Sequence, residues 1–379
     1  MFYPASRGEI DPFIVMQVMS DAVKREAAGD NVLHLEIGQP STPAPKGVLE
    51  AARFALYNDK IGYTVPLGMT KMREKISSHY RKWYDIDVSI ERIVVTTGAS
   101  SGFTIAILSA LEHGSRVAIA SPGYPAYRNI LKSLGAQVVY LATDEKDRFQ
   151  PTLPRLEKAG KLDGLIIASP SNPTGTMLSE NSMKEITRWC QLNGVRLISD
   201  EVYHGIDFGQ RPVSALESNP DAIVINSFSK YFSMTGWRIG WIIAPPELMS
   251  SVERLAASFF ISAPTISQFG AIAAFDCIEE AQKNVARYAL NRDILLNELP
   301  STWLDDLVPA DGAFYIYANV AKYTSDSRKF CQRILTEIGI ACTPGIDFDP
   351  SRGHATIRLS FAGASEDILE ACKRLKAWL

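Results

Sequence analysis

The chain has 379 residues, of which 46% are hydrophobic and 21% charged, and its formal net charge at pH 7 is −3. This composition is typical of a globular protein and excludes a disordered or fibrous chain. The near balance of charge gives no support for nucleic-acid binding, and the length predicts two lobes rather than one hydrophobic core.

The cysteines and the N-terminus indicate a cytoplasmic protein. The five cysteines are an odd number without close pairing, which predicts reduced thiols rather than a disulfide framework. They are Cys190, Cys277, Cys331, Cys342 and Cys372. Near the N-terminus, Arg7, Glu9 and Asp11 interrupt the apolar residues, so we expect no signal peptide. No apolar stretch reaches the length of a transmembrane helix, and we expect no membrane partner.

The first predicted element is a helix over residues 13–28, FIVMQVMSDAVKREAA, whose apolar residues have amphipathic spacing. We expect it to pack on a lobe formed by the C-terminal part of the chain. That lobe is then discontinuous in sequence.

Seven short apolar, β-branched runs between about residues 90 and 245 predict strands, because each is followed by a polar or glycine-containing turn. The runs are RIVVTT, RVAIAS, QVVYLA, GLIIAS, VRLIS, AIVINS and RIGWIIA. Predicted helices lie between several of them, at 101–114, 124–136 and 179–194. The first and third reach a glycine, which we expect to end them. Alternating strand and helix predicts an α/β fold with a mainly parallel, doubly wound, seven-stranded sheet.

The segment from about residue 280 onward has a different pattern. A long helical stretch is followed by GAFYIYANV, a helical SRKFCQRILTEIG and ATIRLSFA. This order predicts a smaller α+β lobe. We therefore predict a large domain over residues 45–280 and a small domain made of residues 1–44 and 281–379.

Ligands of doubly wound sheets bind beyond the carboxyl ends of the strands, where this chain carries SPSNPTG (169–175), SDEVY (199–203) and SFSKYFSMTGWRIG (227–240). Further motifs are IGQPSTPAP (37–45), GYTVPLG (62–68) and IRLSFA (357–362). In these motifs and their order the sequence resembles the fold-type I aminotransferases of class I/II, the family that includes aspartate aminotransferases. The resemblance implies a pyridoxal 5′-phosphate (PLP) cofactor.

Lys230 and Asp200 have the central roles in this resemblance. Lys230 matches the lysine that forms a Schiff base with PLP. Asp200 matches the acid that keeps the pyridine nitrogen protonated, so that the ring withdraws electrons from the substrate. Taken alone, Lys230 also fits a solvated surface lysine and Asp200 also fits a helix cap.

The remaining cofactor contacts are also implied by the resemblance. Tyr203 and Asn172 are assigned to the phenolic oxygen of the ring, and Tyr124 to stacking on it. Asn172 alone also fits a plain turn, and Tyr124 also fits core packing. The phosphate is expected where strand VVTT turns into a helix, because the first N–H groups of a helix face an anion. The residues assigned to it are Gly98, Ala99, Ser100, Ser227, Ser229 and Arg238.

Three further residues are assigned to the substrate and to a partner subunit. Arg358 matches the arginine that binds the substrate α-carboxylate, for which a guanidinium offers two parallel donors. Asn172 reaches the same carboxylate, and Gly38 lies in the segment whose backbone closes over the substrate. Tyr63 matches a tyrosine that reaches the phosphate of the neighbouring subunit. The resemblance therefore implies a homodimer with active sites at the subunit interface.

The implied activity is the transfer of the α-amino group of an amino acid to a 2-oxo acid in a ping-pong cycle. A PLP-dependent β-lyase or decarboxylase is the alternative, because such enzymes share these cofactor residues. A more distant alternative is a serine hydrolase, since residues 98–102 satisfy G-x-S-x-G and Asp347 and His354 follow downstream. That reading gives Lys230 and Arg358 no role. The histidines lack metal-ligand spacing, and we assign no metal.

The preferred amino donor is predicted from a missing charge. Many bacterial aspartate-specific relatives carry a lysine in the phosphate-binding segment, where this chain has Ser100. Phe259 and Phe260 lie in a region that in the resembled family approaches the substrate or the partner subunit, and they favour apolar contact over charge, although they fit interface or core packing at least as well. We expect a neutral or apolar amino acid to be a better donor than aspartate, while glutamate can still be used through Arg358.

Overall fold

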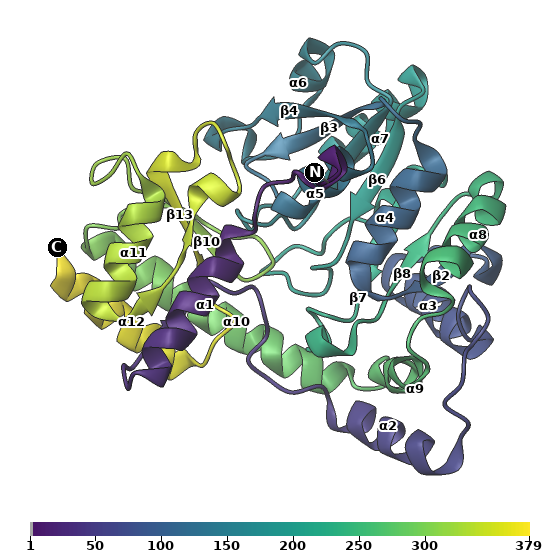
Figure 1. Ribbon diagram of the computed structural model, residues 1–379, viewed down its shortest axis with the longest axis horizontal. Helices are drawn as coiled ribbons and strands as arrows, with labels where there is room; N and C mark the ends of the chain where they lie inside the picture. The colour runs from purple at the N-terminus through teal and green to yellow at the C-terminus, as the bar shows by residue number, and fades with distance from the viewer. Residues whose placement is uncertain (1–2) are drawn as a thin grey trace.

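The computed structural model describes residues 3–379 and divides into two lobes, a larger one with one β-sheet and a smaller one with two (Figure 1). The larger lobe contains a seven-stranded sheet in the order β2-β8-β7-β6-β5-β3-β4. Its strands are β2 (Ile93–Thr96), β3 (Arg116–Ser121), β4 (Gln137–Ala142), β5 (Gly164–Ala168), β6 (Arg196–Asp200), β7 (Ile223–Ser227) and β8 (Gly240–Ile243). Each of the seven predicted runs is one of these strands, so the predicted seven-stranded sheet is confirmed.

The sheet is parallel except at β8, which pairs antiparallel with both β2 and β7. Every residue of β2, β7 and β8 is buried. Strands covered by helices on both faces need apolar residues throughout, which explains the continuous apolar runs in the sequence. In the register, Asp200 at the end of β6 pairs with Ala168 of β5 and Ile225 of β7. The ends of these three central strands therefore lie together.

The helices of the larger lobe confirm the predicted alternation but not every predicted boundary. They are α2 (Lys46–Asn58), α3 (Thr70–Tyr84), α4 (Gly98–Ala110), α5 (Pro125–Ser133), α6 (Leu153–Lys158), α7 (Glu180–Asn193), α8 (Met249–Phe260) and α9 (Thr265–Ala274). Helix α7 ends at Gly194 in the left-handed conformation, as predicted. The prediction that α4 ends at Gly114 is wrong. The backbone is already extended at Leu111, and Gly114 belongs to the following turn, where its N–H donates to the Gly135 carbonyl.

The smaller lobe contains a four-stranded antiparallel sheet, a two-stranded parallel sheet and four helices. Its strands are β1 (Leu33–His34), β9 (Asp306–Val308), β10 (Tyr315–Asn319), β11 (Ile340–Ala341), β12 (Thr343–Pro344) and β13 (Thr356–Ser360). Its helices are α1 (Ile14–Ala27), α10 (Ile278–Glu298), α11 (Ser327–Ile338) and α12 (Ser365–Trp378). Helix α1 packs on this lobe, as expected, with Ala22 in contact with a cluster that includes Leu335 and Ala341.

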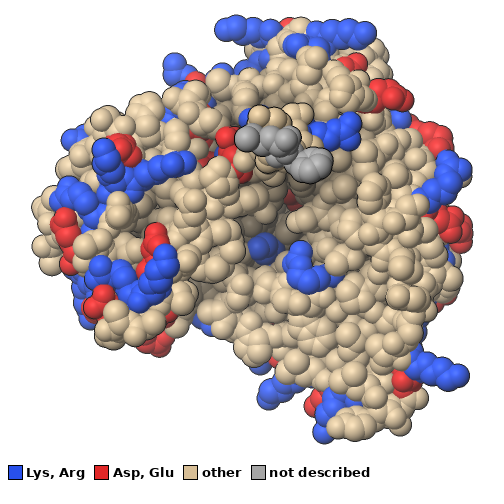
Figure 2. All heavy atoms as spheres, viewed as in Figure 1, with Lys and Arg blue, Asp and Glu red and all other residues tan. Residues whose placement is uncertain are grey.

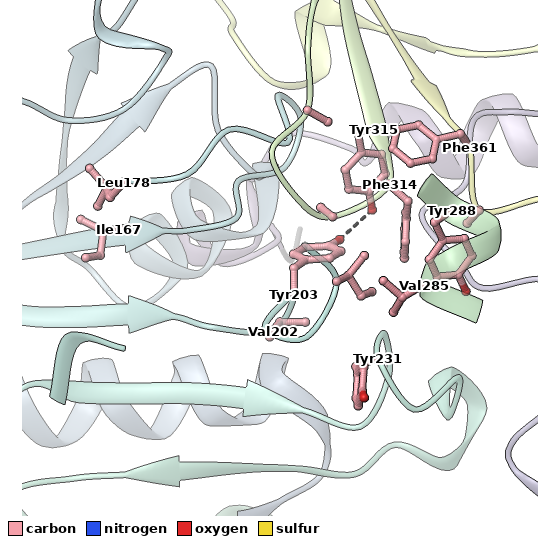
Figure 3. Packing of buried hydrophobic residues seen from close by; sticks show 14 of the residues in the cluster. Ile167, Leu178, Val202, Tyr203, Tyr231, Val285, Tyr288, Phe314, Tyr315 and Phe361 are labelled. Atoms are coloured by element: carbon pink, nitrogen blue, oxygen red, sulfur yellow. Dashed lines mark hydrogen bonds between the residues drawn. The ribbon is translucent and has the colours of Figure 1, made fainter. Parts of the chain in front are cut away.

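The two lobes share one hydrophobic core. Tyr203, which follows β6 of the larger lobe, packs against Phe314 and Tyr315 of the smaller lobe (Figure 3). The predicted domain boundaries at residues 44/45 and 280/281 stay a prediction, and α10 runs through the second of them. Within residues 3–379, no helix is long and apolar enough to cross a membrane.

Candidate active site

A cavity of about 470 Å³ opens at the carboxyl ends of the parallel strands, between the two lobes. Figure 2 shows this face hollowed between the lobes, with basic side chains inside the hollow and beside it. Twelve of the residues that the sequence assigned to cofactor or substrate line the cavity. They are Gly38, Ala99, Ser100, Tyr124, Asn172, Asp200, Tyr203, Ser227, Ser229, Lys230, Arg238 and Arg358. The fold therefore brings together residues that lie up to 320 positions apart, from Gly38 to Arg358 (358 − 38 = 320).

The two other assigned residues lie outside the cavity lining. Gly98 is directly behind Arg238, because a Cβ atom added to this glycine would be 2.6 Å from the Arg238 Nη2. Tyr63 lies in the segment between α2 and α3, and 83% of its surface is exposed. Tyr63 is thus available to another molecule rather than to the cavity of its own chain.

Lys230 lies three residues beyond the end of β7 and projects between the lobes. Its Nζ donates a hydrogen bond to the Gly38 carbonyl oxygen at 2.6 Å. Burial, followed by the charges of Arg358 and Arg238, lowers the pKa of Lys230 to about 8, and the charge of Asp200 opposes this shift. An amine with this pKa is partly neutral at pH 7 to 8, which is the form that attacks a carbonyl and accepts a proton. The alternative of a solvated surface lysine is wrong.

Asp200 is buried at the end of β6, and both of its carboxylate oxygens already accept hydrogen bonds. Oδ1 accepts from the Val202 N–H at 3.0 Å, and Oδ2 accepts a short hydrogen bond from the Tyr127 hydroxyl. Burial raises the pKa of Asp200 to about 6, and these hydrogen bonds oppose the rise. The next helical turn begins only at Ala215, so the alternative of a helix cap is wrong.

One end of the cavity has the donors that a phosphate group requires. Helix α4 begins at Gly98 and directs its first N–H groups toward this end. Gly98 has φ +74°, which suits glycine, and the missing side chain leaves room for the Arg238 guanidinium. The Ser227 and Ser229 hydroxyls are hydrogen-bonded to each other at 2.9 Å, and both residues line this cavity. Helix terminus, guanidinium and hydroxyl together form an anion-binding cradle.

Arg358 marks the opposite side of the cavity, on β13 of the smaller lobe. Its Nη1 donates to the Asn172 Oδ1 at 2.9 Å, and its Nη2 donates to the Glu36 carbonyl and to the Thr343 hydroxyl. Its Nε is buried and has no hydrogen-bond partner among residues 3–379. A buried guanidinium with a spare donor fits the carboxylate of a substrate.

Several cavity residues were not predicted from the sequence. Tyr127 binds Asp200, and its place three residues after Tyr124, which is the N-cap of α5, is the signal that could have identified it. Tyr315 donates to or accepts from Tyr203 across the lobes, and no sequence pattern indicates that contact. The start of helix α1 contributes an apolar wall. Its cavity-lining side chains are those of Phe13, Val15 and Met16.

Two further sequence-based interpretations can be compared with the structure. Neither Phe259 nor Phe260 lines the cavity: Phe259 is exposed at the end of α8, and Phe260 packs against the core of the larger lobe. No hydrogen bond joins Ser100, His354 and Asp347 among the described residues. The Asp347 carboxylate instead accepts from the Val15 N–H and lies beside the Arg128 guanidinium. A hydrolase triad is therefore not formed.

Comparison with known proteins identifies the family. The family described as "Aminotransferase class I and II" matches residues 30–375. The chain belongs to this family. The aminotransferase is 45% identical, over 380 residues, to a valine–pyruvate aminotransferase of Mycobacterium tuberculosis, with 99% of this chain and 98% of the relative covered.

Solved structures agree with this membership. A crystal structure of an aminotransferase from Mycobacterium tuberculosis has a TM-score of 0.98 and 44% identity, covering 100% of this chain and 99% of the other. The aspartate aminotransferase of Thermus thermophilus, solved with maleate, has a TM-score of 0.94 and 28% identity, with both chains covered completely. The fold is that of the fold-type I aminotransferases, and the chain catalyses amino-group transfer. The lyase and hydrolase alternatives are not favoured.

Proposed function

We propose that this aminotransferase is a cytoplasmic homodimer that binds PLP in the cavity between its lobes and takes its amino group from a neutral, apolar amino acid. The observation that carries the proposal is the distribution of charge in the cavity. Lys230 shares the cavity with the anion cradle at Arg238 and a second guanidinium at Arg358, both close enough to lower its pKa, and Asp200 is the carboxylate among the described lining residues. This arrangement fits a cofactor phosphate at one end and a substrate carboxylate at the other.

The residues present fit PLP in chemistry as well as in charge. When bound, PLP supplies an electron-withdrawing ring that stabilises negative charge at the substrate Cα. Asp200 would pair with the ring nitrogen, and Tyr124 would stack on the ring. Tyr203 and Asn172 would bind the phenolic oxygen. The phosphate would be held by the start of α4 with Ser227, Ser229 and Arg238.

The chain's own groups account for the orientation of the substrate and the movement of its proton. Arg358 and Asn172 are hydrogen-bonded to each other, so together they offer a fixed site for one carboxylate. Lys230, with its pKa lowered to about 8, can accept the Cα proton and would return it to the aldehyde-derived carbon of the cofactor. Gly38 brings a backbone carbonyl within hydrogen-bond distance of the Lys230 Nζ, which holds the amine at the centre of the cavity.

The preference for a neutral amino donor rests on the cavity residues that would surround the side chain of the substrate. Phe13, Val15, Met16 and Ile37 form an apolar wall, and the basic side chains lining the cavity are Lys230, Arg238 and Arg358. Each of these three already has a proposed role, so a side-chain carboxylate would be desolvated without a partner. That costs roughly 1 to 3 kcal/mol. The 45% identity to a valine–pyruvate aminotransferase also supports the proposal.

With a common 2-oxo acid acceptor, kcat/KM for valine, alanine, leucine, phenylalanine or methionine is expected to exceed that for aspartate by at least about tenfold, equivalent to about 1.4 kcal/mol. Steady-state assays of the second amino acid product measure it. Met16→Arg is expected to shift the preference toward aspartate, whereas Met19→Arg, on the same helix but outside the cavity lining, is the matched control. A tenfold preference of the wild-type protein for aspartate would contradict the proposal.

The homodimer is proposed from an apolar surface at one end of the larger lobe. Helix α2 and the segment that follows it carry large exposed hydrophobic side chains, and α2 lies at the edge of the molecule (Figure 1). These residues are Leu49, Phe54, Leu56, Tyr57, Ile61, Tyr63 and Val65. A concentration of large exposed apolar side chains in one segment is typical of a subunit interface. We propose that it binds a second copy of the chain and that Tyr63 reaches the partner's phosphate cradle.

Mixing two inactive or weakened variants tests this arrangement. Dimers that contain one Tyr63→Phe chain and one Lys230→Ala chain are expected to hold one intact site, because each site takes Tyr63 from one chain and Lys230 from the other. Each mixed dimer should then bind PLP with wild-type affinity at one of its two sites and have about half of the wild-type activity. Light scattering measures the assembly. A monomer in solution, or no recovery in verified mixed dimers, would argue against the shared site.

A further inference from the structure

Tyr315, the first residue of β10, is buried in the cavity wall and takes no part in the proposed function so far. Its hydroxyl oxygen lies 2.6 Å from that of Tyr203, and Figure 3 shows the two side chains meeting between the lobes. Its ring centroid lies 4.4 Å from the Arg358 guanidinium carbon. Tyr315 thus contacts the residue proposed for the cofactor's phenolic oxygen and the residue proposed for the substrate carboxylate.

The ring of Tyr315 determines how the Arg358 guanidinium is held. The guanidinium carbon lies 4.4 Å from the Tyr315 ring centroid and 4.8 Å from that of Phe348, so two aromatic faces contact this cation. A planar cation is attracted to aromatic faces, and the two contacts restrict its orientation. Hydrogen bonds to Asn172 and Thr343 hold the Nη atoms, whereas only packing orients the unpartnered Nε.

The hydroxyl of Tyr315 determines which way the proton of Tyr203 points. A hydrogen bond between two hydroxyls contains one proton, so one group donates and the other accepts. If Tyr203 donates to the phenolic oxygen of the cofactor, Tyr315 must donate to Tyr203. Among the described residues no other acceptor is hydrogen-bonded to the Tyr315 hydroxyl. A hydroxyl that accepts a hydrogen bond becomes a stronger donor in its own bond.

Gly38 makes this position of the hydroxyl possible. A Cβ atom at residue 38 would lie 1.8 Å from the Tyr315 hydroxyl oxygen, so only glycine leaves room for it. The Gly38 carbonyl in turn accepts the hydrogen bond from the Lys230 Nζ. The Tyr315 hydroxyl therefore packs directly against the segment that contacts the reactive amine.

We propose that Tyr315 is a positioning residue for transamination, which orients Arg358 through its ring and directs the Tyr203 proton toward the cofactor through its hydroxyl. The inference rests on the proposed function of Tyr203 and Arg358. Different substitutions remove the ring and the hydroxyl of Tyr315.

Tyr315→Phe removes the hydroxyl and keeps the ring. Without the Tyr315 hydroxyl, Tyr203 becomes a weaker donor to the phenolic oxygen and stabilises the deprotonated form of the bound cofactor less. The pH at which the bound cofactor changes its visible absorption is therefore expected to rise by about half a pH unit or more. We expect kcat to fall about fivefold and KM for the amino acid to stay within about twofold. Tyr317→Phe is the matched control, since Tyr317 lies on the same strand and its hydroxyl bonds to Thr356 instead. It should leave the absorption and both kinetic constants unchanged.

Tyr315→Leu removes the ring as well. Without the ring, the Arg358 guanidinium is oriented less well for a carboxylate. Relative to Tyr315→Phe, we therefore expect KM for the amino acid to rise by about tenfold. The inhibition constant of 4-methylpentanoate, a carboxylate without an amino group, should rise by about the same factor. Tyr315→Phe should thus bind carboxylates as the wild-type protein does, whereas its absorption transition should still be shifted. Thermal unfolding shows whether each variant is folded, and the Tyr315→Phe result stands by itself if the leucine variant is not.

Tyr203→Phe separates failure of this inference from failure of the proposed function. An absorption transition that moves in Tyr203→Phe but not in Tyr315→Phe would overturn the hydroxyl part of the inference alone. A transition that moves in neither variant would overturn the proposed role of Tyr203 as well. Equal carboxylate binding by folded Tyr315→Leu and Tyr315→Phe would overturn the part that concerns Arg358.

Discussion

Replacing Lys230 by alanine is expected to lower kcat for transamination by about 10,000-fold or more, because the proposed nucleophile and proton carrier is lost in one change. The amine is the reactive group held at the centre of the cavity, with its pKa lowered to about 8 and its Nζ bonded to the Gly38 carbonyl. The cofactor contacts at Asp200 and Arg238 do not depend on this amine. Cofactor affinity is therefore expected to survive in part.

Single-turnover assays and equilibrium binding of PLP measure the two effects separately. Lys329→Ala is a suitable control, because its side chain is 83% exposed on α11 and lies outside the cavity lining. Turnover of the Lys230→Ala protein within about tenfold of wild type would show that another group moves the proton.

Replacing Asp200 by alanine is expected to lower kcat by about 1,000-fold and to weaken cofactor binding. Burial raises the pKa of Asp200 to about 6, so its carboxyl is mostly ionised at pH 7 and can pair with a protonated ring nitrogen. Asp200→Glu keeps the charge and should lose less activity. Asp200→Asn keeps the shape without the charge and should resemble the alanine variant.

The same pKa predicts the pH dependence of cofactor binding. As the pH falls through about 6, Asp200 of the cofactor-free protein becomes protonated and its attraction for a cationic ring is lost. The affinity of the wild-type protein for PLP is therefore expected to decrease on acidification. The affinity of Asp200→Asn should depend less on pH. Fluorescence titrations at several pH values measure it. Full kcat in Asp200→Asn would show that the charge at this position is not required.

The sequence by itself determined the larger sheet and most of the cavity. Strands buried on both faces must be apolar along their whole length, so each could be recognised without knowledge of its neighbours. Parallel strands also place their carboxyl ends along one edge, which is why Asn172, Asp200 and Lys230 could be predicted to meet. The same local signals were insufficient for the end of α4, where the backbone leaves the helix at Leu111, before the glycine.

The tertiary structure alone decided which side chains meet across the lobes. Tyr203 of the larger lobe and Tyr315 of the smaller lobe are 112 positions apart. Nothing near either residue in the sequence indicates the other, because the contact depends on how the two lobes pack together. The apolar wall that starts at Phe13 is likewise formed only when α1 packs on the smaller lobe, since its residues acquire their place beside Tyr124 from that packing.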